Sequence, residues 1–153
     1  DQMVQNLDFA QTLLEATGIG APSDMQGESL IPLFLGNDDQ WTRDAVYYHY
    51  YEYPAVHMVK RHYGIVTRDY KLVHFYFDVD EWELYDRKKD PLELNNVYDE
   101  PQYAETAAKL HTELEALRTK YMDSEELDQK FVKEYFDKSG LNIEDYMKPK
   151  EVE

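Results

Sequence analysis

The stretch that most constrains the fold of this chain is residues 82–98, W-E-L-Y-D-R-K-K-D-P-L-E-L-N-N-V-Y. In its first half the apolar Trp82 and Leu84 alternate with Glu83, which is typical of a strand with one buried face. Asp90-Pro91 ends the pattern, because proline fixes its φ angle and lacks an N–H donor, while aspartate favours turns. On spacing alone, the stretch predicts a last strand and an ordered connector that leads into a helix.

Further strand signals precede this stretch. Residues 46–53 are rich in tyrosine, have high β-propensity and stop at Pro54, which a central strand would not tolerate. Residues 64–67 and 70–76, separated by Arg68-Asp69, predict a hairpin or one long bent strand. Short links between consecutive strands favour an antiparallel meander.

Helical patterns flank the strands. Near the N-terminus, an apolar face predicts a short amphipathic helix that stops at Gly18, and it comprises Val4, Leu7, Ala10, Leu13 and Leu14. After the strands, we expect Asp99 to cap a long helix that accepts Pro101 in its first turn and carries Arg118 away from its apolar stripe. That stripe comprises Tyr103, Ala107, Leu110, Leu114, Leu117 and Tyr121.

Another helix is expected beyond Met122. Asp123 and Glu126 have the spacing of a capping box, and Gly140 provides a stop. Asn142 is expected to cap a last short turn. This extension packs either on its own domain or on one outside the chain, and the sequence leaves both alternatives open.

The fold class that follows is α+β, with a small antiparallel β-sheet of three to four strands covered by a long helix and with additional N- and C-terminal helices. Three segments are predicted. Residues 1–40 form a helix and an irregular crossover, residues 41–122 form the sheet-plus-helix subdomain, and residues 123–153 form a helical C-terminal extension.

Composition excludes several classes of function. The formal net charge of −16 disfavours nucleic acid and anionic membrane surfaces as partners, because both would be repelled. The chain has no cysteine, so disulfides and thiolate metal sites are impossible. The start Asp1-Gln2-Met3 is typical of the middle of a longer protein rather than of a signal peptide.

Three motifs together resemble one protein family. They are W-E-L-Y-D followed by D-P and E-x-N-N, then V-Q-N-L-D-F-A-x-T-L-L-E-A-T-G, and G-E-S-L-I-P-L-F-L-G. They resemble the C-terminal subdomain of type I, formylglycine-dependent sulfatases, in the branch of arylsulfatases and N-sulfoglucosamine sulfohydrolases of the alkaline phosphatase superfamily. The resemblance covers Val4 to Tyr121, with Gln11 where the family usually has proline and Val66 where arginine is frequent.

The resemblance implies a sulfuric ester hydrolase that degrades glycosaminoglycans and is periplasmic or secreted. Its nucleophile, a formylglycine made from a C/S-x-P-S/A-R motif, is absent here, because the chain has no cysteine and none of its four serines begins that motif. Formylglycine and Ca²⁺ are therefore expected in an N-terminal catalytic domain outside this chain, from which residues 1–40 cross over. No catalytic residue is assigned to this chain, and it is expected to be inactive alone.

A local reversal of charge marks the candidate binding site. Residues 57–71 hold Asp69 as their only acid together with these bases and histidines: His57, Lys60, Arg61, His62, Arg68 and Lys71. Such a run either contacts an anion or pairs with acids on the surface. In many relatives this connector lies near the mouth of the active site, which implies substrate contacts from His57, Lys60 and His62, with Tyr63 as a surface for a sugar ring to stack on.

The other histidines, His49, His74 and His111, are expected to be packed or solvated. No pair of histidines has the spacing of a zinc-binding H-E-x-x-H helix, and no metal-ligating residue is assigned to this chain.

Three functions remain open at this point. The first is the C-terminal part of a sulfatase, whose partners are a sulfated saccharide substrate and its own N-terminal catalytic domain. The second is the same part of a phosphoester or phosphonate hydrolase of the same superfamily. The third is a non-catalytic module that binds glycan or protein through its tyrosine-rich strands.

Overall fold

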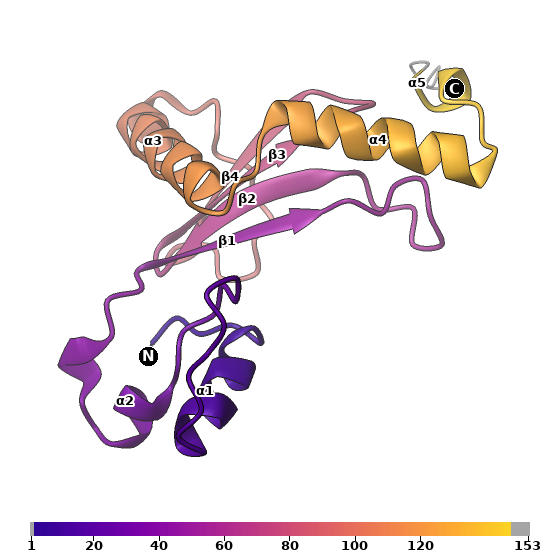
Figure 1. Ribbon diagram of the computed structural model, residues 1–153. Coiled ribbons are helices and arrows are strands. Elements are labelled where there is room, and N and C mark those ends of the chain that lie inside the picture. The colour runs from indigo at the N-terminus through magenta and orange to yellow at the C-terminus, as the bar shows by residue number, and fades with distance from the viewer. Residues whose placement is uncertain (1, 148–153) are drawn as a thin grey trace. The chain divides into compact units, whose positions relative to one another are not determined.

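A computed structural model describes residues 2–147 (Figure 1). Residue 1 and residues 148–153, which belong to the first and third predicted segments, lie outside the described part. The chain divides into two compact units, Asp1–Val46 and Tyr47–Glu153, and each is described by itself.

The first unit contains helix α1 (Asp8–Ala16), the single turn α2 (Ile31–Phe34) and the 3-10 turn η1 (Asp38–Gln40). The amphipathic helix predicted here is present, but its apolar face is not the buried one. Leu7 and Leu13 are 50% and 68% exposed, whereas the buried positions are Asp8, Gln11 and Thr12. The reason is that polar contacts, not apolar ones, tie this helix to the rest of its unit.

Asp8 is the centre of those contacts. Its carboxylate accepts two hydrogen bonds from the Arg43 guanidinium, at 2.6 and 2.8 Å. It also accepts backbone N–H groups from Gln5 at 2.7 Å and Glu28 at 2.9 Å. A fully buried carboxylate is tolerated because every side of it is paired.

The pKa of Asp8 gives a testable pH dependence. Burial alone would raise this pKa, but the hydrogen bonds from Arg43, Glu28 and Gln5 outweigh burial and lower it below 3.8. The stability that Asp8 contributes is therefore present above its unfolded pKa and is lost as pH falls through the lower folded value. Carboxyl-carbon NMR should show Asp8 titrating below 3.8, and titration at or above that value would contradict this account of the unit.

In the second unit the sheet is a meander. The strands β1 (Ala45–Tyr50), β2 (His62–Thr67), β3 (Tyr70–Phe75) and β4 (Glu81–Asp86) lie in chain order. Both the β2–β3 and the β3–β4 pairs are antiparallel, and the register places Ile65 opposite Leu72 and Leu72 opposite Leu84. These three side chains are fully buried and form one apolar row across the sheet. The predicted α+β fold with a small antiparallel sheet is confirmed.

Two helices lie over the same side of this sheet, α3 (Ala104–Lys120) and α4 (Glu125–Ser139) (Figure 1). The predicted stripe of α3 is buried at Ala107, Leu110 and Leu114, and α3 contacts β2 and β3. The 3-10 turn η2 (Pro101–Tyr103) precedes α3, and the short α5 (Glu144–Met147) follows α4. Among residues 2–147, no helix is both long enough and apolar enough to cross a membrane.

The described part of the C-terminal extension, residues 123–147, packs on its own unit. The ring of Phe136 on α4 lies 5.7 Å from that of Phe77, just after β3, and the ring of Phe131 lies 5.5 Å from that of Tyr51. Phe136 and Val132 are buried. The extension therefore completes the aromatic core at one end of the sheet.

Three predictions about these helices are wrong in detail. Pro101 begins η2 rather than α3, and neither of these elements receives a side-chain cap from Asp99. Ser124 caps α4 by accepting the N–H of Leu127, because Asp123 instead points toward β1. Arg118 is buried, since it pairs with Asp128 on the next helix.

Gly64 on β2 provides a test of the sheet's close packing. A Cβ atom built there would lie 2.4 Å from the carbonyl oxygen of Leu72 and 2.9 Å from the hydroxyl of Tyr48. Gly64→Ala is expected to lower the free energy of unfolding by about 1–3 kcal/mol through overpacking. In Gly20→Ala, the matched control, the added Cβ has no neighbour within 4 Å. Denaturant unfolding compares the two, and equal stabilities would refute the steric argument.

Candidate functional site

The connector between β1 and β2 carries the predicted substrate contacts His57 and Lys60. His57 is exposed, and Lys60 is half-buried. The Lys60 Nζ lies 3.3 Å from Asp78 Oδ2, while 43% of the lysine side chain remains exposed. Both side chains can reach a ligand on this surface, and Lys60 would exchange a partly exposed ion pair for it.

Two other bases of the predicted run, Arg61 and Lys71, do not gather with them. Arg61 is only 1% exposed, its Nε donates to the carbonyl of Tyr53, and its guanidinium lies near the rings of Phe77 and Tyr135. Lys71 forms a 2.6 Å ion pair with Glu93. The run is therefore not one continuous basic surface, because strand geometry and burial divide it.

His62 and Tyr63 are neighbours on β2 and so point to opposite faces of the sheet. The His62 ring stacks on Tyr50, with centroids 5.5 Å apart, and its Nδ1 lies 2.8 Å from the Lys60 carbonyl. Tyr63 faces the helices and is 5% exposed, with the Arg118 guanidinium 4.0 Å from its ring centroid. The role predicted for Tyr63, stacking on a sugar, does not fit this position, because Arg118 covers its ring.

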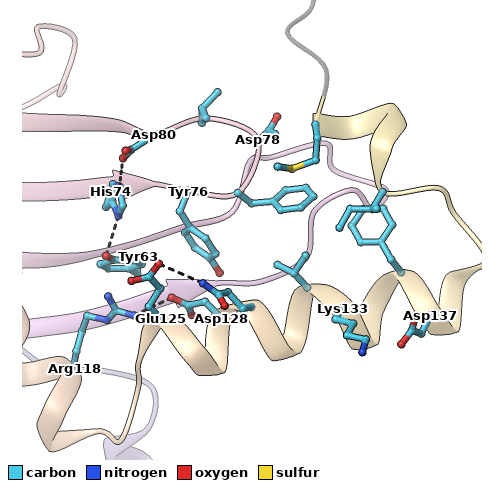
Figure 2. A pocket seen from close by; sticks show the side chains of 17 residues that line it. Tyr63, His74, Tyr76, Asp78, Asp80, Arg118, Glu125, Asp128, Lys133 and Asp137 are labelled. Atoms are coloured by element: carbon cyan, nitrogen blue, oxygen red, sulfur yellow. Dashed lines mark hydrogen bonds and ion pairs between the residues drawn. The ribbon is translucent and has the colours of Figure 1, made fainter.

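A pocket of about 910 Å³ lies where β3 ends, between the turn that follows it and the helices α4 and α5 (Figure 2). Its apolar wall comprises Phe77, Val79, Val132, Phe136, Ile143 and Met147. Its acids are Asp78, Asp80, Glu125, Asp128 and Asp137, against Arg118 and Lys133 as bases. This excess of acid favours cations and disfavours a sulfate group, so the pocket differs in character from the connector around His57.

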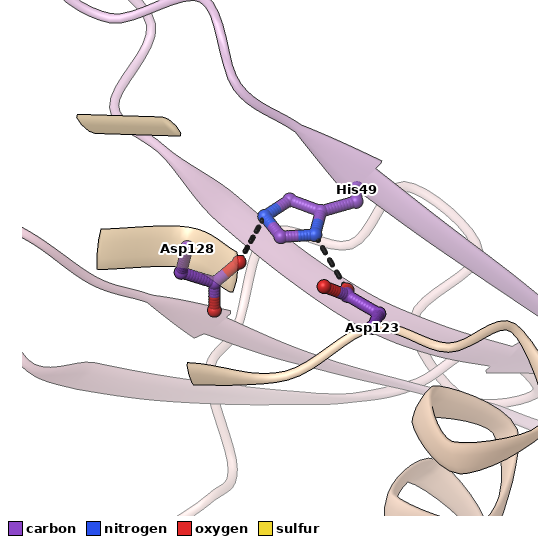
Figure 3. A group of neighbouring side chains, drawn as sticks. All are labelled: His49, Asp123 and Asp128. Atoms are coloured by element: carbon purple, nitrogen blue, oxygen red, sulfur yellow. Dashed lines mark hydrogen bonds and ion pairs between the residues drawn. The ribbon is translucent and has the colours of Figure 1, made fainter. Parts of the chain in front are cut away.

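Beside this pocket, the His49 ring lies between two carboxylates (Figure 3). Its Nδ1 is 2.8 Å from Asp123 Oδ2, and its Nε2 is 3.6 Å from Asp128 Oδ1. Burial and the nearby charge of Asp123 raise the pKa of Asp128 to about 7, and burial lowers the pKa of His49. Sequence reasoning missed this cluster, because more than seventy residues separate His49 from the two aspartates and no local spacing signals it.

Comparison with known proteins shows the family of this chain. The family model described as "N-sulphoglucosamine sulphohydrolase, C-terminal" matches residues 1–120. This chain belongs to that family. The family match contains the whole sheet, the connector and α3, and it ends before α4, so the helices that complete the pocket lie outside it.

Two curated proteins from Bacteroides thetaiotaomicron are similar to this chain. An N-acetylglucosamine-6-O-sulfatase is 51% identical over 78% of this chain and 22% of its own length. A delta 4,5-hexuronate-2-O-sulfatase is 31% identical over 76% of this chain and 24% of its own length. The chain thus spans about a quarter of the length of these relatives.

Solved structures support the same fold. The structure of BT4656 in complex with its substrate D-glucosamine-2-N,6-O-disulfate matches with a TM-score of 0.72 and 52% identity, over 77% of this chain and 24% of that one. The phosphonate monoester hydrolase of Agrobacterium radiobacter matches with a TM-score of 0.65 and 25% identity, over 79% and 26% of the two chains. Sulfatases and phosphonate hydrolases therefore share this C-terminal fold.

Proposed function

We propose that this chain is the C-terminal domain of a sulfatase that hydrolyses a sulfate ester on a glucosamine-type sugar of a glycosaminoglycan. The observation that carries the proposal is the 51% identity to an N-acetylglucosamine-6-O-sulfatase over 78% of the chain. The phosphonate hydrolase shares only 25% identity, which makes phosphonate hydrolysis the weaker alternative.

In this proposal the bond-breaking groups belong to the rest of the enzyme. Formylglycine requires a cysteine or serine in its own motif, and no residue of this chain fits it. The family's catalytic Ca²⁺ is likewise assigned to the catalytic domain. This chain would supply donors that hold the substrate beside the nucleophile, which lowers the barrier through positioning.

His57 and Lys60 are the residues proposed for that task. A lysine ammonium and an imidazole N–H both donate to a sulfate or carboxylate oxygen, and a charged donor strengthens the bond. His62 is proposed to shape the same surface from β2, since its ring is already stacked on Tyr50 and bonded to the Lys60 carbonyl.

The partner proposed for α1 is the catalytic domain of the same polypeptide. Phe9 and Leu13 on α1 and Leu7 just before it are 50–68% exposed, whereas the polar Asp8, Gln11 and Thr12 of the helix are buried. Apolar side chains of this kind are typical of an interface within a larger protein. The relatives, about four times longer than the matched region, provide room for such a domain.

His57→Ala in the complete enzyme tests the proposal. It is expected to lower kcat/KM for a 6-O-sulfated glucosamine by about 5- to 150-fold, because one charge-assisted hydrogen bond is lost. Val56→Ala is the control, since Val56 precedes His57 in the connector and is 94% exposed. The unmutated enzyme, His57→Ala and Val56→Ala should have the same melting temperature, because the side chains of His57 and Val56 both lie in solvent.

The same assay separates the alternatives. Faster turnover of a phosphonate monoester than of the sulfated sugar by the complete enzyme would favour the phosphonate hydrolase. Tight binding of the sulfated sugar to the 153-residue chain alone, measured by calorimetry, would favour a non-catalytic glycan-binding module. An unchanged kcat/KM in His57→Ala would remove His57 from the substrate site.

A further inference from the structure

The His49 cluster has an unusual arrangement of buried polar atoms. The side chains of His49, Asp123 and Asp128 are 3%, 5% and 6% exposed, and they come from β1, the α3–α4 turn and α4. Their candidate ligand atoms all lie within 4.8 Å of one another. Three separate elements thus direct nitrogen and oxygen ligands to one buried place.

The hydrogen bonds leave specific oxygens unused. Asp123 Oδ2 accepts from the Tyr47 hydroxyl and faces His49 Nδ1, and Asp128 Oδ2 accepts from Arg118 Nη2 at 2.9 Å. The Oδ1 atoms of both aspartates are buried and have no hydrogen-bond partner. Burying a carboxylate oxygen without a partner costs free energy, so a cation or a hydrogen-bond donor beside either atom would stabilise the fold.

The orientation of the His49 ring indicates where such a cation would bind. Because a carboxylate only accepts, the proton of a neutral ring lies on Nδ1, toward Asp123, and the lone pair lies on Nε2. The Tyr76 hydroxyl, 2.6 Å away, donates to that lone pair, and the unpaired Asp128 Oδ1 lies 3.6 Å from the same nitrogen. Arg118 balances one of the two aspartates, so the cluster lacks one positive charge when both carboxylates are ionised.

We propose that His49 Nε2 and Asp128 Oδ1 bind a divalent transition-metal ion of the Zn²⁺ type. Ligand atoms that are each about 2.0–2.2 Å from zinc are at most about 4.4 Å apart, so a separation of 3.6 Å fits between them. A mixed imidazole and carboxylate set favours Zn²⁺ over Ca²⁺ and Mg²⁺, which prefer oxygen ligands alone. Asp123 orients the ring through Nδ1, an arrangement common around metal-binding histidines.

The pocket gives the ion its route and its remaining ligands. Asp128 and Tyr76 both line the pocket, and an ion on His49 Nε2 would take the place of the 2.6 Å hydrogen bond from the Tyr76 hydroxyl. Water in the pocket can complete the coordination shell. The acids that line it raise the local concentration of cations.

This site goes beyond the proposed function. Its residues Asp123 and Asp128 lie after residue 120, where the family match ends, and no step of sulfate hydrolysis is assigned to it. The ion would join β1 to the start of α4 and so stabilise the extension, because binding to the folded state alone raises stability.

Imidazole-nitrogen NMR of the 153-residue chain, titrated with ZnCl₂, tests the proposal. One equivalent of Zn²⁺ is expected to shift the Nε2 resonance of His49 and leave its Nδ1 protonated, while His57 and His111 keep their shifts. Calorimetry should give one site per chain, weakened at least tenfold in Asp128→Asn. Asp137→Asn is the matched control, because Asp137 lines the same pocket outside the cluster and carries the same charge.

Other outcomes would overturn the proposal. If His49 simply gains a proton as pH falls and Zn²⁺ leaves its nitrogens unchanged, the missing charge is a proton. If only exposed histidines shift, the chain binds an adventitious ion only. Equal weakening in Asp128→Asn and Asp137→Asn would indicate general attraction by the acidic pocket. The NMR result on the unmutated chain stands even if Asp128→Asn fails to fold.

Discussion

Arg118→Leu is expected to lower the free energy of unfolding by about 3–5 kcal/mol, the usual cost of removing one partner from a buried ion pair. Arg118 donates to Asp128 Oδ2 at 2.9 Å, and its Nε lies 3.9 Å from Asp123 Oδ2. Without it, two nearly buried aspartates would face each other with no fixed cation between them. The guanidinium also covers the Tyr63 ring, so leucine would lose that contact as well. Denaturant unfolding followed by circular dichroism measures the loss.

Two companion variants make the Arg118 result specific. Lys109→Leu removes a base from the same helix, but its ion pair with Glu113 is largely exposed, so a change within about 0.5 kcal/mol is expected. Adding Asp128→Asn to Arg118→Leu removes one unpaired charge and should recover part of the stability. If Arg118→Leu costs no more than Lys109→Leu, then the ion pairs of Arg118 do not hold α3 to α4.

Leu114→Ala is expected to cost about 2–5 kcal/mol, the range for truncating a leucine in a core that cannot collapse around the cavity. Leu114 is fully buried on the face of α3 that contacts β2 and β3. The substitution should lower the stability of the sheet and of α3 together, because they share one core. Thermal and denaturant unfolding should therefore show a single lowered transition for the second unit.

Leu92→Ala is the control, because it is the same leucine-to-alanine substitution at a side chain that is 75% exposed. Its expected effect is within about 0.5 kcal/mol. A loss in Leu114→Ala no greater than in Leu92→Ala would mean that α3 does not cover the sheet in solution.

The strands and α3 could be predicted because their signals are local. Alternation in Trp82-Glu83-Leu84 and the spacing of Ala107, Leu110 and Leu114 each report a buried face within a few residues. Turn residues such as Pro54 also act locally, and β1 ends shortly before it. These patterns were sufficient for the order of the elements and for the fold class.

The polar interior could not be predicted, because its partners are distant in sequence. Asp8 and Arg43 are 35 residues apart and His49 and Asp123 are 74 apart, so neither pair forms a motif. Burial of a charged side chain opposes its usual preference for water, and only a partner brought by the fold makes it tolerable. For this reason α1 was assigned the wrong buried face and Arg118 the wrong environment.

The candidate site was predicted in part. The charge reversal in residues 57–71 pointed to the connector, where His57 and Lys60 are accessible. Charge along the sequence carries no information on the face of a strand or on burial, so Arg61 and Tyr63 were grouped with residues that they do not accompany. The sulfatase resemblance supplied the family, which the comparisons confirm, while the substrate contacts stay predictions.

The central proposal is that the bond-breaking groups lie outside this chain. Its most direct test is to measure sulfate release from a 6-O-sulfated glucosamine by the 153-residue chain alone, with the complete enzyme as the positive control. We predict release by the complete enzyme and none by the chain above the rate of a heat-denatured sample. Catalytic sulfate release by the purified chain would contradict the assignment of the nucleophile to another domain.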